Sequence, residues 1–187
     1  MTSSQSAIAR VETKLDHFAN DPQWQRIWLA IQAEKWRSLA VIPADATLPT
    51  IEVVHALAAV ACQQRGSPLV VADLRSVDLP ILDAVRAEVE ARTAAAPILM
   101  AVPAFDESPV ALAIARAADK AVLCVGLGTT LASQARKTIQ QLGHDRFLGT
   151  VTLRLKRTGA RPSAWGRRGQ GTRESGRNPG TDRPHPL

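Results

Sequence analysis

The sequence predicts an α/β fold of three layers, in which helices cover both faces of a mainly parallel sheet. Short aliphatic runs recur along the chain without polar alternation, as expected of strands buried on both faces. Longer segments of helical periodicity separate these runs, which is the order of β-α-β units. The chain has 187 residues, of which 45% are hydrophobic, enough for one sizeable core.

The aliphatic runs, rich in Val, Ile and Leu, predict the strands Ser38–Pro43, Pro68–Asp73, Pro97–Val102, Ala121–Val125 and Gly149–Leu155. The helical segments between them predict the helices Thr50–Gln64, Leu79–Thr93, Pro109–Ala118 and Leu131–Leu142. Two more helices are predicted before the first strand, Ile8–Phe18 and Pro22–Trp36. The second of these has Asp21 as its N-cap and Pro22 at its first position.

The charge distribution divides the chain into a neutral body and a basic tail. Residues 1–155 hold 15 basic and 15 acidic residues, whereas residues 156–187 hold eight basic and two acidic ones, which accounts for the whole net charge of +6. The tail has too few large apolar residues to offset the entropy of ordering it, so we expect it to be disordered. The expected organisation is an N-terminal helical segment (1–36), an α/β domain (37–155) and this tail (156–187).

Hydropathy, cysteine placement and tail charge give expectations about where the protein is located and what it binds. No apolar stretch is long enough to cross a bilayer and no secretion signal is recognisable, so we expect a cytoplasmic protein. Cys62 and Cys124 lie among aliphatic residues and are interpreted as buried hydrophobes. The tail is interpreted as solubilising; weak binding of its arginines to an acidic surface is the alternative, and nucleic acid is not expected as a partner.

Ligands of such folds bind at the carboxyl ends of the strands, so the loops there are the candidate site. The segments that surround these loops are Val41–Ala58, Leu69–Arg75, Ile98–Phe105 and Ala117–Val151. In their order and spacing they resemble the cytoplasmic ATPase domains of bacterial tyrosine autokinases of capsule and exopolysaccharide synthesis, relatives of the MinD/ParA-type ATPases. The resemblance covers roughly residues 22–155 and implies a P-loop NTPase-like fold.

The first segment occupies the place of the family's phosphate-binding loop. Such a loop needs glycines, free N–H groups, a lysine for the terminal phosphates and a hydroxyl for magnesium. In this chain Pro49 stands at the last loop glycine, Thr50 at the lysine and Ile51 at the hydroxyl. Asp45 and Glu52 add negative charge where a triphosphate would lie. These replacements remove most of the charge-assisted contacts that anchor a nucleotide.

The next two segments lack the carboxylates that the resemblance implies. Val71 stands at the first aspartate of the second strand, whereas Asp73 and Arg75 match the family and are expected to end the strand or to form a local ion pair. Ala101 stands at the aspartate of the third strand, and Pro103 matches. The fourth segment keeps only architectural residues, among them Gly126, Gly143 and a threonine that could cap the next helix.

The helix Pro22–Trp36 carries an apolar stripe that must be covered. Trp24, Ile27 and Trp28 share this stripe, and Arg26 alone remains of the family's Glu-x-x-Arg-x-x-Arg assembly motif. Two interpretations stay open. Either the tryptophans pack on their own sheet, or Trp24, Arg26, Ile27 and Trp28 form a partner interface.

Together these residues predict a pseudo-ATPase, a non-catalytic regulatory or scaffold protein without a cofactor. The chain has no tyrosine, which excludes autophosphorylation of a tyrosine tail. The resemblance implies a location peripheral to the inner membrane, with a polysaccharide chain-length regulator or a second copy of the chain as partner. The alternative function is an atypical, magnesium-dependent ATPase or other small-ligand enzyme that uses Asp45, Asp73 and Glu52.

Overall fold

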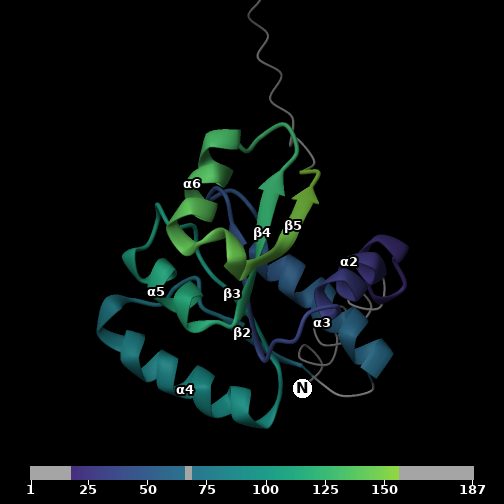
Figure 1. The fold of residues 1–187 in the computed structure, drawn as a ribbon, viewed down its shortest axis with the longest axis horizontal. Coiled ribbons are helices and arrows are strands. Elements are labelled where there is room, and N and C mark those ends of the chain that lie inside the picture. The colour runs from purple at the N-terminus through teal and green to yellow at the C-terminus, as the bar shows by residue number, and fades with distance from the viewer. Residues whose placement is uncertain (1–17, 66–68, 156–187) are drawn as a thin grey trace, which may run out of the picture. The chain divides into compact units, whose positions relative to one another are not determined.

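The computed structural model describes residues 18–65 and 69–155, which belong to one compact unit (Figure 1). The described strands are β1 (Ser38–Pro43), β2 (Val70–Asp73), β3 (Ile98–Ala101), β4 (Lys120–Gly126) and β5 (Phe147–Leu153). The main helices are α2 (Pro22–Gln32), α3 (Thr50–Arg65), α4 (Leu82–Ala95), α5 (Pro109–Ala117) and α6 (Ala132–Leu142). The predicted helix Ile8–Phe18, except for its last residue, and the predicted disordered tail (156–187) lie outside the described residues.

The strands form one parallel sheet in the order β2-β3-β1-β4-β5. Strand β1 is central, with β3 on one side and β4 on the other, and all of its residues are buried. Because its side chains point alternately to the two faces, a wholly apolar strand requires a cover on both. This arrangement confirms the α/β fold class and is compatible with a P-loop-like fold.

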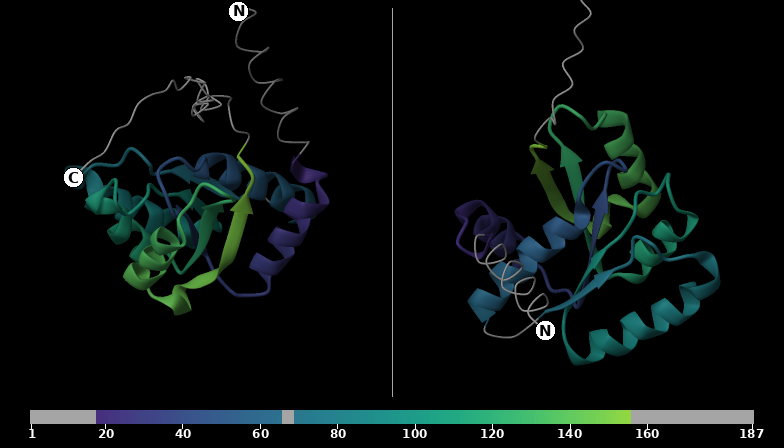
Figure 2. Two further views of the ribbon diagram at one scale, coloured as in Figure 1. Left: turned by 90° about the horizontal axis from the view of Figure 1, so that it is seen from above. Right: turned by 180° about the vertical axis from the view of Figure 1, so that it is seen from behind.

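Helices cover both faces of the sheet, as the views from above and from behind show (Figure 2). On one face Leu39 and Val41 pack in a core with residues of α2 and α3. On the other face Ala40 and Ile42 pack in a second core with residues of α4, α5 and α6. The β1–α3 connection therefore leaves the sheet on the opposite face from the connections that follow β3 and β4.

The two edge strands are less buried than predicted. The residues of β3 are all buried, but Val70, Val71 and Ala72 of β2 are half-buried, and Asp73 is exposed. In β5 the strand begins two residues before the predicted Gly149, which is itself exposed. The prediction that every strand is internal is therefore wrong for the edges, because an edge strand has a neighbour on one side only.

Helix α2 begins as predicted but ends early. The backbone N–H of Gln23 donates to the Asp21 side chain at 2.8 Å, which confirms the N-cap. The helix ends at Gln32 and not at Trp36, because the indole N–H of Trp36 donates to the carbonyl oxygen of Ile31 at 3.0 Å. The Trp36 ring also packs edge-on against Trp28, with 6.1 Å between the ring centroids.

The remaining predicted helices are present, with no end shifted by more than three residues. The predicted helix Leu79–Thr93 begins with a short 3₁₀ helix, Leu79–Ile81, before α4. Gly143 follows α6 with φ of 104°, a left-handed conformation that favours glycine and ends the helix as predicted. Within the part of the chain that the structure describes, no helix is long and apolar enough to cross a membrane.

Replacing Trp28 by alanine should lower the free energy of unfolding by about 3–5 kcal/mol, because its side chain is fully buried between α2 and the sheet. Leu29→Ala is the matched control, since this neighbouring side chain is 57% exposed. We expect the control to change stability by no more than about 0.5 kcal/mol. Urea unfolding followed by circular dichroism measures both, and equal midpoints would contradict the packing of α2 on the sheet.

Candidate functional site

The candidate site is the crevice at the carboxyl end of β1. Here the chain leaves β1 toward α3 on one face, whereas it leaves the neighbouring strands β3 and β4 toward helices on the other face. Such a change of direction creates the crevice in which open α/β sheets bind ligands. The structure places Asp45, Pro49, Thr50, Ile51 and Glu52 together in the loop after β1 and the first turn of α3.

The backbone donors at the start of α3 are bonded within the chain. The N–H of Thr50 donates to the carbonyl of Leu48 at 2.9 Å. The N–H groups of Glu52 and Val53 both donate to the carbonyl of Pro49, at 3.1 and 3.4 Å. In a phosphate-binding loop the free donors of the first helical turn point at the anion. The Val53 bond is the i→i−4 bond that any α-helix makes at this position. The amides of Thr50 and Glu52 are the ones that the loop itself engages.

The side chain of Thr50 faces the interior and not the crevice. Thr50 is 1% exposed, and its hydroxyl has no hydrogen-bond partner among the described residues. A buried hydroxyl without a partner costs about 1–3 kcal/mol relative to a satisfied one. At the position where the resemblance implies a lysine, the chain therefore holds a short, enclosed side chain that cannot reach a phosphate.

Asp45 connects the loops that follow β1 and β4. Its carboxylate accepts hydrogen bonds from the backbone N–H of Thr47 at 3.1 Å and from the Thr47 hydroxyl at 2.5 Å. It also accepts a hydrogen bond from the hydroxyl of Thr130. The Thr130 hydroxyl in turn accepts one from the backbone N–H of Gly126, at 2.8 Å. We call Asp45, Thr130 and Gly126 the loop clamp.

The clamp keeps Asp45 ionised although the residue is only 9% exposed. Burial alone raises the pKa of its carboxyl, but the hydrogen bonds from Thr130 and Thr47 together outweigh burial, so the pKa lies below its ordinary value. The loop after β1 thus presents a negative charge that is already saturated with donors. Glu52, which is exposed on the first turn of α3, adds a second negative charge.

Gly126 is tightly surrounded by side chains. A Cβ atom at this position would lie 2.1 Å from the hydroxyl oxygen of Thr129, 3.1 Å from the Leu48 side chain and 3.2 Å from the Thr130 hydroxyl oxygen. Thr129 is exposed and lies in the same loop, so its side chain would have to rotate away, and Leu48 and Thr130 would have to shift by a few tenths of an ångström. A larger residue at this position would therefore disturb the Thr130 hydroxyl that bonds to Asp45.

At the end of β2, Asp73 and Arg75 form the local ion pair that the sequence allowed. Arg75 donates from Nε at 2.8 Å and from Nη2 at 2.7 Å, one to each carboxylate oxygen of Asp73. These hydrogen bonds, the largest contribution, hold the pKa of Asp73 below its ordinary value. Both side chains are exposed, so the pair contributes little to stability.

The other predicted positions on these strands are apolar and packed. Asp73 lies opposite Ala101 in the register of β2 and β3, and Val71 lies opposite Leu99. Ala101 and Pro103 are buried, and Val71 packs against the same core as α3. The third strand therefore brings a methyl group, and no carboxylate, to the place where the resemblance implies a metal-binding aspartate.

The structure does not bring the acidic residues together. Asp45 follows β1 and Asp73 ends β2, and β3 lies between these strands. Neighbouring strands are about 4.8 Å apart, which separates the two strands by roughly 10 Å. Within residues 18–65 and 69–155, no three His, Cys, Asp or Glu side chains are grouped as a metal site would require.

A small cavity borders the crevice beside Ala44. A cavity of about 60 Å³ lies between the loop after β1, the loop after β3 and α6. Its lining includes Ala44, Phe105, Asp106 and Lys137. This volume matches the share of about two water molecules, whereas pockets for drug-sized ligands usually hold about 300 Å³ or more. A nucleotide would not fit in this cavity without movement of the loops.

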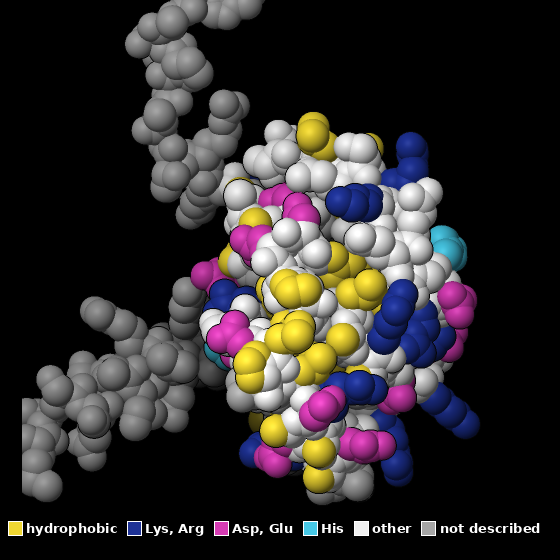
Figure 3. Space-filling view, turned by 90° about the vertical axis from the view of Figure 1, so that its left-hand side faces the viewer, with side chains coloured by type: hydrophobic (Ala, Val, Ile, Leu, Met, Phe, Trp, Pro, Cys, Tyr) yellow, Lys and Arg dark blue, Asp and Glu magenta, His cyan; other side chains and the backbone are white. Residues whose placement is uncertain are grey.

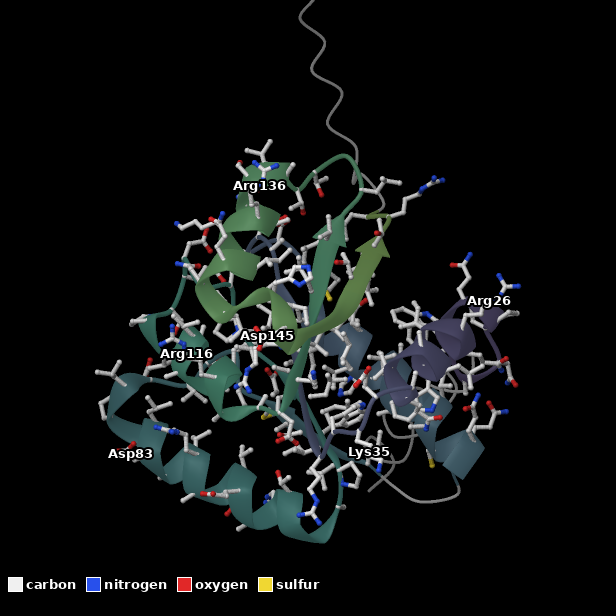
Figure 4. All side chains as sticks on the ribbon, in the orientation of Figure 1. Arg26, Lys35, Asp83, Arg116, Arg136 and Asp145 are labelled. Carbon is white, nitrogen blue, oxygen red and sulfur yellow. The ribbon has the colours of Figure 1, made fainter. Side chains whose placement is uncertain are left out.

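The four residues of the candidate partner interface differ in exposure. Trp28 is fully buried and belongs to the core beneath α2, so it offers no surface to a partner. Trp24 and Ile27 are half-buried against the same core, and Trp24 meets the ring of Phe18 edge-on. Arg26 is exposed and points from α2 away from the sheet (Figure 4). The stripe therefore mainly packs on its own unit.

Thr130 is the functional contact that the sequence did not reveal. The sequence suggested a threonine cap for the next helix, but α6 is preceded by Leu131, whose N–H donates to the Gln134 side chain at 3.0 Å. Thr130 bonds to Asp45 instead, 85 residues away in sequence. No local pattern could have indicated a contact at that separation.

Comparison with known proteins adds no family. No protein-family model matches the chain, and no curated protein is significantly similar to it.

Replacing Thr130 by valine should lower the free energy of unfolding by about 1.5–3 kcal/mol at neutral pH, because it removes a donor to a buried carboxylate. Asp45 has a lower pKa in the folded than in the unfolded chain, so its contribution is present above about pH 4 and is lost as the pH falls through the folded pKa. The difference between variant and wild type should shrink in that acidic range.

Urea unfolding at neutral and acidic pH measures this difference, with Thr129→Val, an exposed neighbour, as the control. A destabilisation that does not change with pH would show that the valine acts through packing and not through Asp45.

Proposed function

We propose that this protein is a pseudo-ATPase, a non-catalytic regulatory or scaffold protein whose α/β fold serves protein–protein contacts. One observation carries the proposal: the first turn of α3, where a phosphate-binding loop would hold the nucleotide, is closed by hydrogen bonds within the chain. The amides of Thr50 and Glu52 are engaged, and the Thr50 side chain is enclosed. A phosphate group would find few donors there.

Electrostatics supports the same proposal. Asp45 is held in its ionised form by the loop clamp, and Glu52 lies on the first turn of α3. A triphosphate placed at this helix terminus would meet two negative charges, whereas the helix dipole supplies only about half a positive charge. Without a lysine to neutralise the phosphates, the net interaction is repulsive.

The alternative, an atypical ATPase or small-ligand enzyme, requires Asp45, Asp73 and Glu52 to act on one ligand. Asp45 is saturated by two threonines, and Asp73 is paired with Arg75. Asp45 and Asp73 also belong to strands that are not neighbours. We therefore favour the non-catalytic function, in which the crevice keeps the position of a nucleotide site but binds no nucleotide.

The biological setting rests on the sequence resemblance to the exopolysaccharide autokinases. It points to a cytoplasmic regulator that docks on an inner-membrane polysaccharide chain-length regulator. On α2, the exposed Arg26 is the residue of the family's assembly motif that this chain retains. A contact through Arg26, with Trp24 and Ile27 beside it, is consistent with such docking because arginine and tryptophan are frequent anchors of interfaces.

Magnesium-ATP should neither bind nor stabilise the protein. Isothermal titration should give no heat beyond that of dilution, and the melting temperature should not change with added nucleotide. The melting-temperature measurement is sensitive, because a ligand at a hundred times its Kd would add about 2.7 kcal/mol to the free energy of unfolding. ATP without magnesium and magnesium alone are the controls.

Micromolar binding of magnesium-ATP would overturn the proposal. In that case Asp45→Asn and Asp73→Asn should be compared for ATP hydrolysis, because the alternative function needs both carboxylates. If binding were retained but both variants hydrolysed ATP at the wild-type rate, the nucleotide site would lie elsewhere.

A further inference from the structure

The loop between β4 and α6 exposes two leucines on one turn. Leu127 is 56% exposed and Leu131 is 64% exposed. Between them Gly128 has a φ of 77°, and a Cβ atom on it would meet no atom within 4 Å, so the turn projects into solvent. Hydrophobic and basic side chains lie near one another at the upper end of the molecule, where α6 lies (Figure 3). Single exposed leucines are ordinary on protein surfaces, but two on one projecting turn form a local apolar patch.

The backbone of this loop is already hydrogen-bonded. The N–H groups of Thr129 and Thr130 both donate to the carbonyl of Gly126, at 3.3 and 3.1 Å. The N–H of Leu127 donates to the last carbonyl of β5 at 2.8 Å, and that of Leu131 donates to a side chain of α6 at 3.0 Å. A backbone donor that enters an apolar medium without a partner is costly. The loop can therefore bring its leucines into an apolar phase without carrying these four donors in unpaired.

The surroundings of the two leucines are basic. Arg136 lies on the part of α6 next to the loop (Figure 4), and Arg154 directly follows β5, whose last residue is bonded to Leu127. Both arginines are exposed, and neither has an ion pair or a side-chain hydrogen bond within the described part of the chain. The two segments that carry them, residues 121–144 and 146–155, contain no aspartate or glutamate.

Charge distinguishes these leucines from another exposed leucine at the same end of the sheet. Leu79, in the loop after β2, is exposed as well, but Asp78 precedes it and Asp83 lies on the first turn of α4. The surface of an anionic membrane is negative, so it repels acidic side chains and attracts basic ones. The loop after β4 therefore has the charge that complements such a surface, and the loop after β2 does not.

We propose that Leu127, Leu131, Arg136 and Arg154, which we call the leucine tip, contact the surface of an anionic lipid bilayer. The leucines enter the boundary between headgroups and acyl chains, and the arginines bind the lipid phosphates. A projecting turn suits a bilayer, which deforms around it, whereas a protein partner would need a pocket that matches its shape. The contact does not depend on whether the crevice binds nucleotide, so its test is separate from that of the proposed function.

Co-sedimentation of the full chain with vesicles measures the contact. Vesicles of equal parts phosphatidylglycerol and phosphatidylcholine should bind the chain at least about tenfold more tightly than phosphatidylcholine alone, since each basic side chain near an anionic surface adds about fivefold. Leu127→Ser/Leu131→Ser should weaken this binding about tenfold or more, because it removes the apolar contact. Arg136→Glu/Arg154→Glu should weaken it at least as much.

Leu29→Ser is the matched control for the leucine variant. Leu29 lies on α2 and is as exposed as Leu127, so its replacement should leave vesicle binding unchanged. The basic residues 156–187 are the same in every variant, so differences between variants report on the leucine tip. All substituted side chains are exposed, and the melting temperatures of the variants should therefore match that of the wild type.

A fluorescent label tests where on the chain the contact lies. Thr129→Cys in a Cys62→Ser background places one reactive thiol on the projecting turn, because Cys124 is buried and burial raises the pKa of its thiol to about 12. The dye NBD on this thiol should shift its emission to shorter wavelength when anionic vesicles are added. The same dye on Cys62 of the wild type, which is exposed on α3, should not respond.

A wild-type chain that does not bind the anionic vesicles would overturn the proposal. So would binding that neither double variant weakens, or an NBD label on Thr129→Cys whose emission does not shift, because the contact would then lie outside the leucine tip. Binding to soluble polyglutamate that is as tight as binding to vesicles, and that depends equally on the two leucines, would assign the tip to an acidic protein surface and would also overturn it.

Discussion

The burial of β1 on both faces is the constraint on which the rest of the structure depends. A strand whose residues are all buried needs neighbours on both sides and helices above and below it. The chain meets this need by crossing to one face after β1 and to the other face after β3 and β4. The same crossing opens the crevice at the end of β1, so the core and the candidate site have one origin.

The crevice is then closed by residues of the chain itself. Asp45, Thr130 and Gly126 hold the loops after β1 and β4 together, and the first amides of α3 bond to their own loop. A nucleotide-binding protein leaves such donors for its ligand. Here these donors bond within the chain and join the loops after β1 and β4.

The two edge strands are the less protected part of the sheet. A sheet with five strands leaves two edges, and the β2 edge exposes apolar side chains next to a groove. On the opposite face α2 covers its own core with Trp28 and Trp36, which removes most of the tryptophan stripe from the surface. The unit thus covers the face under α2 well, whereas the β2 edge beside α4 keeps half-buried apolar residues.

The sequence by itself determined the fold class and nearly all the elements, and it named the residues that stand in the crevice. Aliphatic runs, the Asp21 cap and the residues at Thr50 and Ala101 are local features, and local features survive in a one-dimensional pattern. Only the tertiary structure decided the strand order, the burial of Trp28, the early end of α2 and the bond between Asp45 and Thr130. Each of these depends on contacts between residues that are far apart in the sequence. A local hydrophobic pattern does not specify which distant residues will meet.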